Sequence, residues 1–599
     1  MKGIEAKVKI KKDRKTNKNE NDDSKEKSLE KTQSKRNENL HSIFHSILFM
    51  NVDIKFAALA VIYLVFICIS VTPITFQNDT FYTIKIGELI KNSGIDMMDH
   101  FSWHENLPYT YPHWLYDFLT YLVYAKGGFK GVYILTFVLS VILGVSIFTV
   151  NNKLNKNAPL AFIVTVGTIY MLRDYITARA QLVTFILFIW EVYCIEKFIE
   201  NRKLIYAIIL VAISLLIANL HVAVWPFFFV VFLPYIAEYL ISLISDCIVY
   251  QKSKDLMFRR KIKSYKKKNV NPEEQKRLNQ KYEEFKQHIS RVKIKRQKDM
   301  ENPYKILVKT KPNVKWLIII MIICALMGLL TPLKDTPYTY LYKTMKGNTT
   351  ENINEHLPLT LADSTDIICV LIIFLAVLIF SDAKIRLSDL FMLGGLCYLM
   401  FESRRQSSIF VLICSIILTR MVIDLINRHT ENGLKNIEDF FKNIWVIILT
   451  TMLVSTLCLH FWKPKKNDPY VDSSSYPVDA CDYILKTMDL SNVRFYNNYN
   501  YGSYMLFRGI PVFIDSRADL YTPEFNGNED EDIFSDFLDS SGLGTFYEDT
   551  FNKYHITHLL IPKNSKISMI IERTHDENYK ELYKDSHFII YERLNDNVD

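Results

Sequence analysis

One polar stretch, Asn78 to Asp117, concentrates residue types that can do chemistry at a membrane surface. Asp79, Asp99, His104 and His113 alternate there with tyrosine, phenylalanine and tryptophan. Carboxylates and imidazoles can transfer protons, and they can also bind metal ions. The stretch follows the first long apolar run, so it begins where a membrane would end. The pattern indicates a site at the water boundary of a membrane protein.

The apolar residues around this stretch are clustered into long runs. Of the 599 residues, 49% are hydrophobic, and clustering without helical or strand periodicity is typical of membrane spans. The runs predict a polytopic α-helical membrane protein with about eleven transmembrane helices. They lie at about 54–71, 131–150, 159–172, 181–198, 204–218, 222–245, 316–331, 366–381, 390–401, 407–423 and 444–462.

The basic residues indicate the side of each loop, because cytoplasmic loops are rich in lysine and arginine. Residues 1–46 contain 13 Lys or Arg against 8 Asp or Glu, which predicts a disordered cytoplasmic tail. Residues 246–315 contain 22 against 8 and predict a cytoplasmic insert that is helical from Pro272. With the N-terminus in the cytoplasm, residues 463–599 are expected on the extracytoplasmic side of a cell membrane.

The chain after about residue 463 has the composition of a soluble domain. Apolar segments that begin at Arg494, Pro511, Thr557 and His587 are typical of strands, and amphipathic segments lie between them. This alternation predicts a small α/β domain. The predicted domains are 1–46, a disordered basic cytoplasmic tail; 47–245, a transmembrane module with its first outer loop at 72–130; 246–315, the basic cytoplasmic insert; 316–462, a second transmembrane module; and 463–599, the outer soluble α/β domain.

The composition disfavours two classes of partner. The net charge of +8 could suit a nucleic acid, but the excess lies beside membrane spans, so no nucleic-acid partner is expected. The soluble tail has no glycine-rich phosphate loop, so nucleotide binding is not expected either. Cys481 is the single cysteine of that tail and cannot form an internal disulfide there.

Six further polar residues fall at span ends that face the Asp79 loop. Ionisable groups near the membrane are costly enough to favour a functional site. A single arginine or histidine can equally extend toward the lipid headgroups, but six on one side favour a site. They are Arg179, Gln181, Asn219, His221, Arg404 and Arg405.

Short motifs along the chain resemble the polytopic GT-C-fold glycosyltransferases, the bacterial polyprenyl-phosphate-sugar-dependent type and its uncharacterised relatives. The resemblance implies a GT-C-like fold and transfer of a sugar from a polyprenyl-phosphate carrier outside the membrane. It also implies that Asp79 is the catalytic base. The motifs are D-T-F-Y-T-I-K-I-G from Asp79, D-H-F-S-W from Asp99, H-W-L from His113, R-A-Q-L from Arg179, N-L-H from Asn219, I-N-E-H-L-P from Ile353, R-R-Q from Arg404 and Y-G-S-Y-M-L-F-R-G-I-P-V-F-I-D-S-R-A-D-L-Y from Tyr501.

Inverting sugar transfer from a lipid phosphate needs a base for the acceptor hydroxyl and cations for the leaving phosphate. Arg179, Arg404 and Arg405 are the predicted phosphate-binding residues, because guanidinium groups form paired hydrogen bonds with phosphate. Aromatic residues beside them can stack on a sugar ring or belong to the aromatic belt of a membrane interface. The predicted substrate-binding residues are Gln181, Asn219, His221, Tyr82, Trp114 and His113.

Two groups of acidic residues have structural alternatives. Asp79 can instead cap a short helix from Thr80 to Lys91, because aspartate is a preferred N-cap. In the tail, an ion-paired structural turn is favoured over contact with the acceptor for Asp515, Arg517 and Asp519.

A divalent metal ion is a further option for the first loop. Asp99 and His104 are the weak candidates for its ligands, because their spacing matches no tight metal-binding motif.

The leading prediction is therefore a membrane glycosyltransferase of the cell envelope, with a polyprenyl-phosphate sugar lipid as its partner. A catalytically inactive scaffold for envelope assembly is one alternative, and a lipid or glycan transporter is another. The transporter is disfavoured because the chain shows no matching halves with helices interrupted by glycine and proline.

Overall fold

The computed structural model describes residues 52–245, 248–267, 270–297, 304–360, 364–528 and 531–594. The predicted tail at 1–46 lies outside these described residues. The chain divides into two compact units after Tyr63, within helix α2 (Val52–Val71). The described part of the first unit is the beginning of α2, and the sections below concern the second unit.

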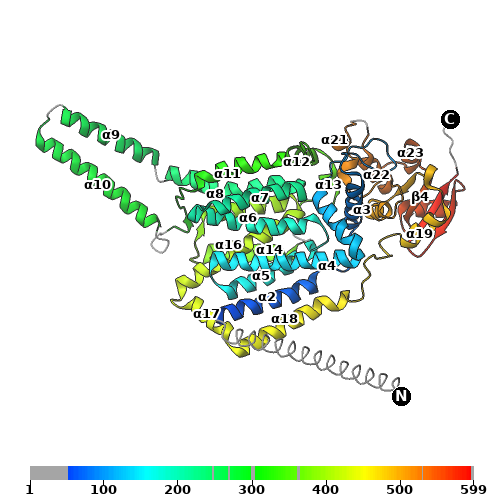
Figure 1. Ribbon diagram of the computed structural model, residues 1–599, viewed down its shortest axis with the longest axis horizontal. Helices are drawn as coiled ribbons and strands as arrows, with labels where there is room; N and C mark the ends of the chain where they lie inside the picture. Colours follow the sequence, from blue (N-terminus) through cyan, green and yellow to red (C-terminus); the bar gives the residue numbers. More distant parts are fainter. Residues whose placement is uncertain are drawn as a thin grey trace, which may run out of the picture. The chain divides into compact units, whose positions relative to one another are not determined.

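Long apolar helices make up the larger part of the second unit (Figure 1). Many of their side chains are exposed, such as Leu453 at 70% and Phe380 at 88%, which suits a lipid environment and not water. The helices are α4 (Trp114–Asn155), α5 (Ala158–Leu172), α6 (Ala180–Asn201), α7 (Leu204–Leu220), α8 (Trp225–Ser245), α11 (Val314–Leu326), α14 (Thr365–Phe380), α15 (Leu387–Glu402), α16 (Ser407–His429) and α18 (Ile444–Lys465).

Every predicted apolar run overlaps α2 or one of these helices, so a helical architecture is confirmed. Four helical segments of the described residues are long and apolar enough to cross a membrane: Trp114–Asn155, Val222–Ile244, Arg404–His429 and Ile444–Lys465. The remaining helices are shorter or less apolar, and the count of about eleven spans stays a prediction.

Local sequence signals explain where several helices begin and bend. The Asn157 side chain accepts a hydrogen bond from the Leu160 backbone N–H at 3.0 Å, and Pro159 lies in the first turn of α5; both features favour a helix start. Gly128 interrupts α4 with φ 57° and ψ −153°. The first part of α4 therefore belongs to the predicted outer loop, and the apolar part follows the kink.

The first loop packs tightly on itself and on the tail. Its helix α3 (Asn78–Ser93) crosses α4 at Gly87, where an added Cβ would lie 2.1 Å from the Asp117 carbonyl oxygen. Phe81 lies 4.9 Å from the Tyr476 ring and 5.1 Å from the Tyr504 ring, measured between centroids. Loop and tail thus share one hydrophobic core, which fixes the position of Asp79 in the first turn of α3.

The tail contains a four-stranded sheet of order β3-β4-β6-β5. Strands β3 and β4 are parallel, and the other two pairs are antiparallel. Three of the four predicted strands are present, but the segment from Pro511 forms only an isolated bridge between Val512 and Ser102. The elements are α19 (Val478–Thr487), β3 (Phe495–Asn497), α20 (Tyr499–Phe507), α21 (Pro523–Asn526), α22 (Ile533–Gly542), α23 (Tyr547–Lys553), β4 (His558–Pro562), α24 (Lys566–Thr574), β5 (Tyr579–Lys584) and β6 (Phe588–Arg593).

The basic insert forms a helical hairpin, with a helix beginning at Pro272 as predicted. Its helices lie side by side (Figure 1), and Phe258 packs on Tyr282 and Phe285 with ring centroids 5.5 and 5.7 Å away. The helices are α9 (Ile248–Lys267) and α10 (Pro272–Gln297). The remaining elements are β1 (Ile306–Leu307), α12 (Thr336–Lys346), α13 (Thr349–Asn352), β2 (Ile385–Arg386) and α17 (Gly433–Lys442).

Candidate functional site

The first loop, the tail, residues 340–356 and the N-terminal ends of α6 and α16 line a cavity of about 640 Å³. Ligand pockets in proteins typically measure roughly 300–1,000 Å³. Six charged side chains from distant parts of the chain line it: Asp79, Arg179, Glu355, Arg405, Arg517 and Asp519. This space is called the Asp79 cavity below, and it is the candidate site.

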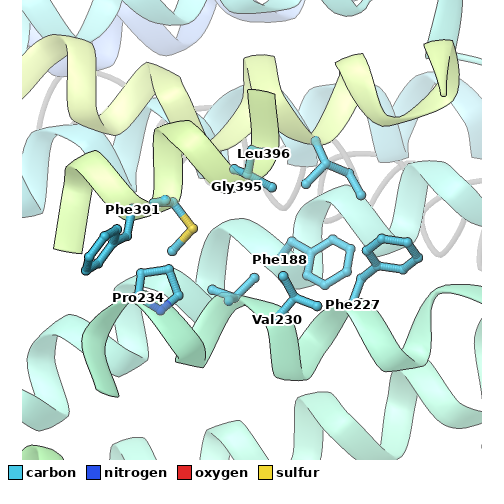
Figure 2. A pocket seen from close by; sticks show the side chains of 10 residues that line it. Phe188, Phe227, Val230, Pro234, Phe391, Gly395 and Leu396 are labelled. Atoms are coloured by element: carbon cyan, nitrogen blue, oxygen red, sulfur yellow. The ribbon is translucent and has the colours of Figure 1, made fainter. Parts of the chain in front are cut away.

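A second cavity among the helices has a different character. It holds about 30 Å³ and is surrounded by apolar side chains of α6, α8 and α15, including Phe188, Pro234 and Phe391 (Figure 2). A space of this size holds one or two waters at most, and a buried water needs polar partners. The cavity is a packing gap and not a binding site.

Asp79 and Arg179 form an ion pair on the wall of the Asp79 cavity, with 2.8 Å between Oδ2 and Nη2. Asp79 lies in the first turn of α3, and Arg179 directly precedes α6. The alternative that Asp79 caps a helix from Thr80 is wrong, because α3 begins at Asn78 and Gln77 occupies the cap position. The carboxylate of Asp79 is directed at a guanidinium instead.

Glu355 is a second partner of Arg179 and was not among the predicted site residues. Arg179 Nη1 donates to both Glu355 carboxylate oxygens, at 3.0 and 3.2 Å. Burial would raise the pKa of Glu355, but the charges of Arg179 and Arg405 outweigh burial and lower it. The signal for this residue was present in the sequence, because Glu355 belongs to the motif that begins at Ile353.

The neighbouring arginines Arg404 and Arg405 differ in where their side chains go. The Arg404 guanidinium donates to Asn354 Oδ1 at 3.0 Å and to the Pro358 carbonyl oxygen at 3.2 Å, and Arg404 is not part of the cavity wall. Arg405 lines the cavity and has no ion pair or side-chain hydrogen bond with the residues that the structure describes. Arg405 is thus the arginine with an uncommitted guanidinium.

Two neutral histidines line the cavity next to these charges. Burial, together with Arg405 and Arg179, lowers the pKa of His113 to about 3. Burial also lowers the pKa of His221 well below its usual value, with further contributions from His113 and Arg405. The two rings lie 4.8 Å apart. Both are therefore uncharged at neutral pH and can accept as well as donate a hydrogen bond.

The hydrogen bonds around His221 assign its tautomer. Its Nδ1 lies 3.0 Å from Thr184 Oγ1, and that hydroxyl donates to the Ala180 carbonyl oxygen at 3.1 Å. Because the hydroxyl has one hydrogen, Nδ1 must carry the proton and donate it to Thr184. Nε2 is then an acceptor, and it is buried without a partner within the described part of the chain.

Four predicted substrate-binding residues divide into one that reaches the cavity and three that do not. Tyr82 lines it. The Trp114 indole donates to Asn219 Oδ1 at 3.1 Å, and the Asn219 amide donates to the Leu330 carbonyl oxygen at 3.2 Å. Gln181 reaches Ser408 Oγ at 3.4 Å. Trp114, Asn219 and Gln181 form hydrogen bonds between helices and do not line the cavity. Their residue types alone do not distinguish this structural role from contact with a substrate.

The two candidate metal ligands of the first loop have separate partners. Asp99 forms an ion pair with Arg517 at 2.6 Å and accepts from the Ser102 hydroxyl at 2.6 Å. His104 Nε2 donates to the Phe513 carbonyl oxygen at 2.9 Å, and burial lowers the pKa of this ring to about 4. No group of three or more His, Cys, Asp or Glu residues in the described ranges is placed to hold a metal ion.

The tail residues Asp515 and Arg517 form a buried ion pair at 2.7 Å, as the structural alternative expected. With Asp99 they link the tail to the first loop. Asp519 differs, because it accepts hydrogen bonds from the Tyr340 hydroxyl at 2.7 Å and the Thr349 hydroxyl at 2.9 Å while it lines the cavity. The ion pairs of Arg517 with Asp99 and Asp515 therefore hold in place the tail segment that lines one side of the cavity.

Comparison with known proteins gives matches in structure and none in sequence: no protein-family model and no curated protein matches the chain. The archaeal oligosaccharyltransferase AglB from Archaeoglobus fulgidus, solved with an inhibitory peptide and a dolichol-phosphate, matches with a TM-score of 0.50 and 9% identity. The match covers 91% of this chain and 75% of that one.

A second similar structure is ArnT from Cupriavidus metallidurans, solved with undecaprenyl phosphate. It has a TM-score of 0.46 and 8% identity, and the match covers 90% of this chain and 97% of that one. The AglB structure has the GT-C fold, and its match covers nearly the whole of this chain. The fold of this chain is therefore the GT-C fold, as the motifs predicted.

Proposed function

We propose that this chain is a membrane glycosyltransferase that moves a sugar from a polyprenyl-phosphate-linked donor to an extracytoplasmic acceptor. The GT-C fold supports this class of reaction. The dolichol-phosphate bound to the archaeal neighbour supports a polyprenyl lipid as the partner. The long apolar helices support a location in a membrane, with the first loop and residues 463–599 outside.

The uncommitted guanidinium of Arg405 is the observation that carries the proposal. A half-buried arginine without a carboxylate partner is costly unless an anion joins it. Its charge contributes to the lowered pKa of His113, His221 and Glu355, so it acts across the whole cavity. A phosphate ester would neutralise it and would accept its paired N–H groups.

The other charged groups supply what inverting transfer needs. The acceptor oxygen attacks the anomeric carbon, the carbon–oxygen bond to phosphate breaks, and the phosphate leaves with the bonding electron pair. Asp79 takes the proton of the acceptor hydroxyl. Arg179 already bonds Asp79 and Glu355, so it positions the base, and Arg405 is the main contact of the leaving phosphate.

A divalent metal ion does not fit these residues. The Asp79 carboxylate already has a guanidinium at 2.8 Å. Among the described residues, no group of three or more His, Cys, Asp or Glu side chains is placed to hold a metal ion. The proposed reaction therefore contains no step that uses a metal.

The test measures transfer of radiolabelled sugar from polyprenyl-phosphate donors by the purified, detergent-solubilised full chain, with the membrane fraction of the source organism as acceptor. Asp79→Asn should lower the rate by about 10²–10⁴-fold, the usual contribution of a general base. Asp174→Asn is the matched control, because Asp174 is 77% exposed and lies off the cavity wall. Transfer that survives Asp79→Asn, or no transfer from any donor, contradicts the proposal.

A further inference from the structure

The tail contains another cavity, of about 650 Å³, at one edge of its sheet. Strands β3 and β4 are parallel, with Asn497 opposite Leu560, so their carboxyl ends meet at this edge. The residues that follow them, Asn498 and Lys563, line the cavity. Ligands of open α/β sheets bind outside the carboxyl ends of parallel strands. This space is called the sheet-edge cavity below.

The floor of the sheet-edge cavity is aromatic. Tyr476, Tyr501 and Phe588 line it and are only 6%, 2% and 3% exposed. The Tyr501 hydroxyl donates to the Leu560 carbonyl oxygen at 2.6 Å, so its polar end points into the protein. The small part of each ring that reaches the cavity is therefore aromatic carbon.

The rim of the same cavity is polar and uncommitted. Asn500, Asn564 and Ser586 are exposed there, and their side chains have no hydrogen-bond partner among the described residues. Amide and hydroxyl groups both donate and accept, and so do the hydroxyl groups of a sugar. An aromatic floor under a rim of amides and hydroxyls suits a carbohydrate.

The charged residues of the sheet-edge cavity provide no site for paired hydrogen bonds with an anion. The Asp79 cavity has three arginines in its wall, whereas the sheet-edge cavity has none. Glu572 on the rim is paired with Lys584 at 2.5 Å, which leaves Lys563 as the rim's single uncompensated charge. A phosphate or a carboxylate would find no guanidinium there to hold it.

We infer that the sheet-edge cavity binds a neutral, hydroxyl-rich glycan, and that this glycan is the acceptor of the proposed reaction. The second part rests on the proposed function. Asn498 and Asn500 line both cavities, so they are the shared wall between them. A glycan chain held at the sheet edge can therefore present its growing end to Asp79.

The test applies fluorescently labelled full-length protein in detergent to a glycan array that carries neutral, phosphorylated and carboxylated oligosaccharides. Neutral glycans should bind, and the double variant Asn564→Ala with Ser586→Ala should weaken that binding at least tenfold. Ser491→Ala with Asn492→Ala is the matched control, because it removes the same two side-chain types away from the cavity. Equal melting temperatures establish that all variants are folded.

Three outcomes overturn the inference: no glycan binds, only charged glycans bind, or the cavity variant and the control bind alike. Glycan binding by Asp79→Asn and sugar transfer by the wild type, measured side by side, separate the two proposals. If Asp79→Asn still binds glycan and the wild type shows no sugar transfer, the sheet-edge site is supported and the proposed transferase activity is contradicted. If the wild type transfers sugar but binds no glycan, the transferase proposal is supported and the sheet-edge site is contradicted.

Discussion

Arginines and carboxylates meet at both ends of α6, α15 and α16, and the two ends use them differently. At one end, Arg386 and Arg420 each bond both Glu196 and Asp389, with ion-pair distances of 2.6 to 2.9 Å. This group is called the Glu196 cluster. At the other end, in the Asp79 cavity, Arg179 bonds both Asp79 and Glu355, and Arg405 bonds neither.

The difference shows that the number of charges does not distinguish a structural cluster from a ligand site. The Glu196 cluster contains two arginines and two carboxylates, and the Asp79 cavity contains three of each, so the formal charge of both groups is zero. In the Glu196 cluster each of the four charged groups is paired within the cluster, as in a structural ion-pair network. The Asp79 cavity leaves one guanidinium available, and this surplus is what a ligand can use.

The largest effect is expected from breaking the Glu196 cluster. Asp389→Ala removes a buried carboxylate from two partly buried guanidinium groups, and loss of one partner of a buried pair typically costs about 3–5 kcal/mol. We expect little folded protein, measured by melting temperature and size-exclusion chromatography in detergent. Glu355→Gln is the comparison, because Glu355 is 48% exposed and Arg179 keeps Asp79. Similar losses in both variants would erase the distinction between the ends.

Arg405→Met should have the opposite profile. A hydrogen bond to a charged group contributes about 1.5–3 kcal/mol, so the KM for the lipid donor should rise roughly 10- to 100-fold, while the melting temperature stays constant. Arg404→Met is the neighbouring control, because Arg404 holds the 354–358 loop. If Arg404→Met and Arg405→Met raise KM equally, Arg405 has no special relation to the donor.

Lowering the pH should destabilise the part of the protein around the Asp79 cavity before it affects the Glu196 cluster. His104 is neutral in the folded protein, with a pKa near 4 against 6.5 for the free side chain, so the unfolded chain binds more protons between these values. Stability is then complete above about pH 6.5 and falls as the pH drops toward 4, by on the order of 1–2 kcal/mol for a partly exposed ring.

Hydrogen exchange measured between pH 4.5 and 7 checks this prediction at two places. Amides of residues 98–109 and 511–522 should lose protection on acidification, while those around the Glu196 cluster should not. His104→Gln keeps a donor for the Phe513 carbonyl oxygen but cannot titrate, so the pH dependence should become smaller in this variant. The part that remains comes from His113 and His221, whose lowered pKa values act in the same direction. Uniform loss of protection would mean that acid does not discriminate between the ends.

The smallest effect is expected from removing the insert. Its hairpin has a small aromatic contact of its own at Phe258, Tyr282 and Phe285, and its residues line neither the Asp79 cavity nor the sheet-edge cavity. Replacing Lys252 to Lys298 with a flexible linker should change melting temperature and transfer little. A large loss of transfer with normal folding would give the hairpin a regulatory role.

Much of the architecture follows from the sequence because its signals are strong. Apolar runs locate the helices, and three of the four predicted strands lie in the short apolar segments that begin at Arg494, Thr557 and His587. The segment from Pro511 fails because its neighbours are long-range: Gly502 lets it approach α20 so closely that an added Cβ would lie 2.0 Å from the Ile514 carbonyl oxygen. Local propensity cannot report such an approach.

The candidate site was only partly accessible from the sequence. Asp79, Arg179, His221 and Arg405 meet at one cavity because charged groups at span ends need partners. Residue type could not separate Arg404 from Arg405, since the difference lies in which way each side chain leaves the same short turn. Asn219 and Gln181 are polar like ligand contacts, yet their bonds to Trp114 and Ser408 hold helices together.

The shared core of the first loop and the tail also sets the order in which the protein can be completed. The Tyr476 hydroxyl bonds the Phe76 carbonyl oxygen across 400 positions of sequence, and the Trp103 indole bonds the Phe495 carbonyl oxygen across 392. At a synthesis rate of roughly 5–20 residues per second, the loop waits on the order of 20–80 s for its partners. During that interval Phe81 has no core to enter, and no Asp79 cavity exists. An unfinished chain is therefore inert, and the loop is the segment that most needs protection from aggregation while translation continues.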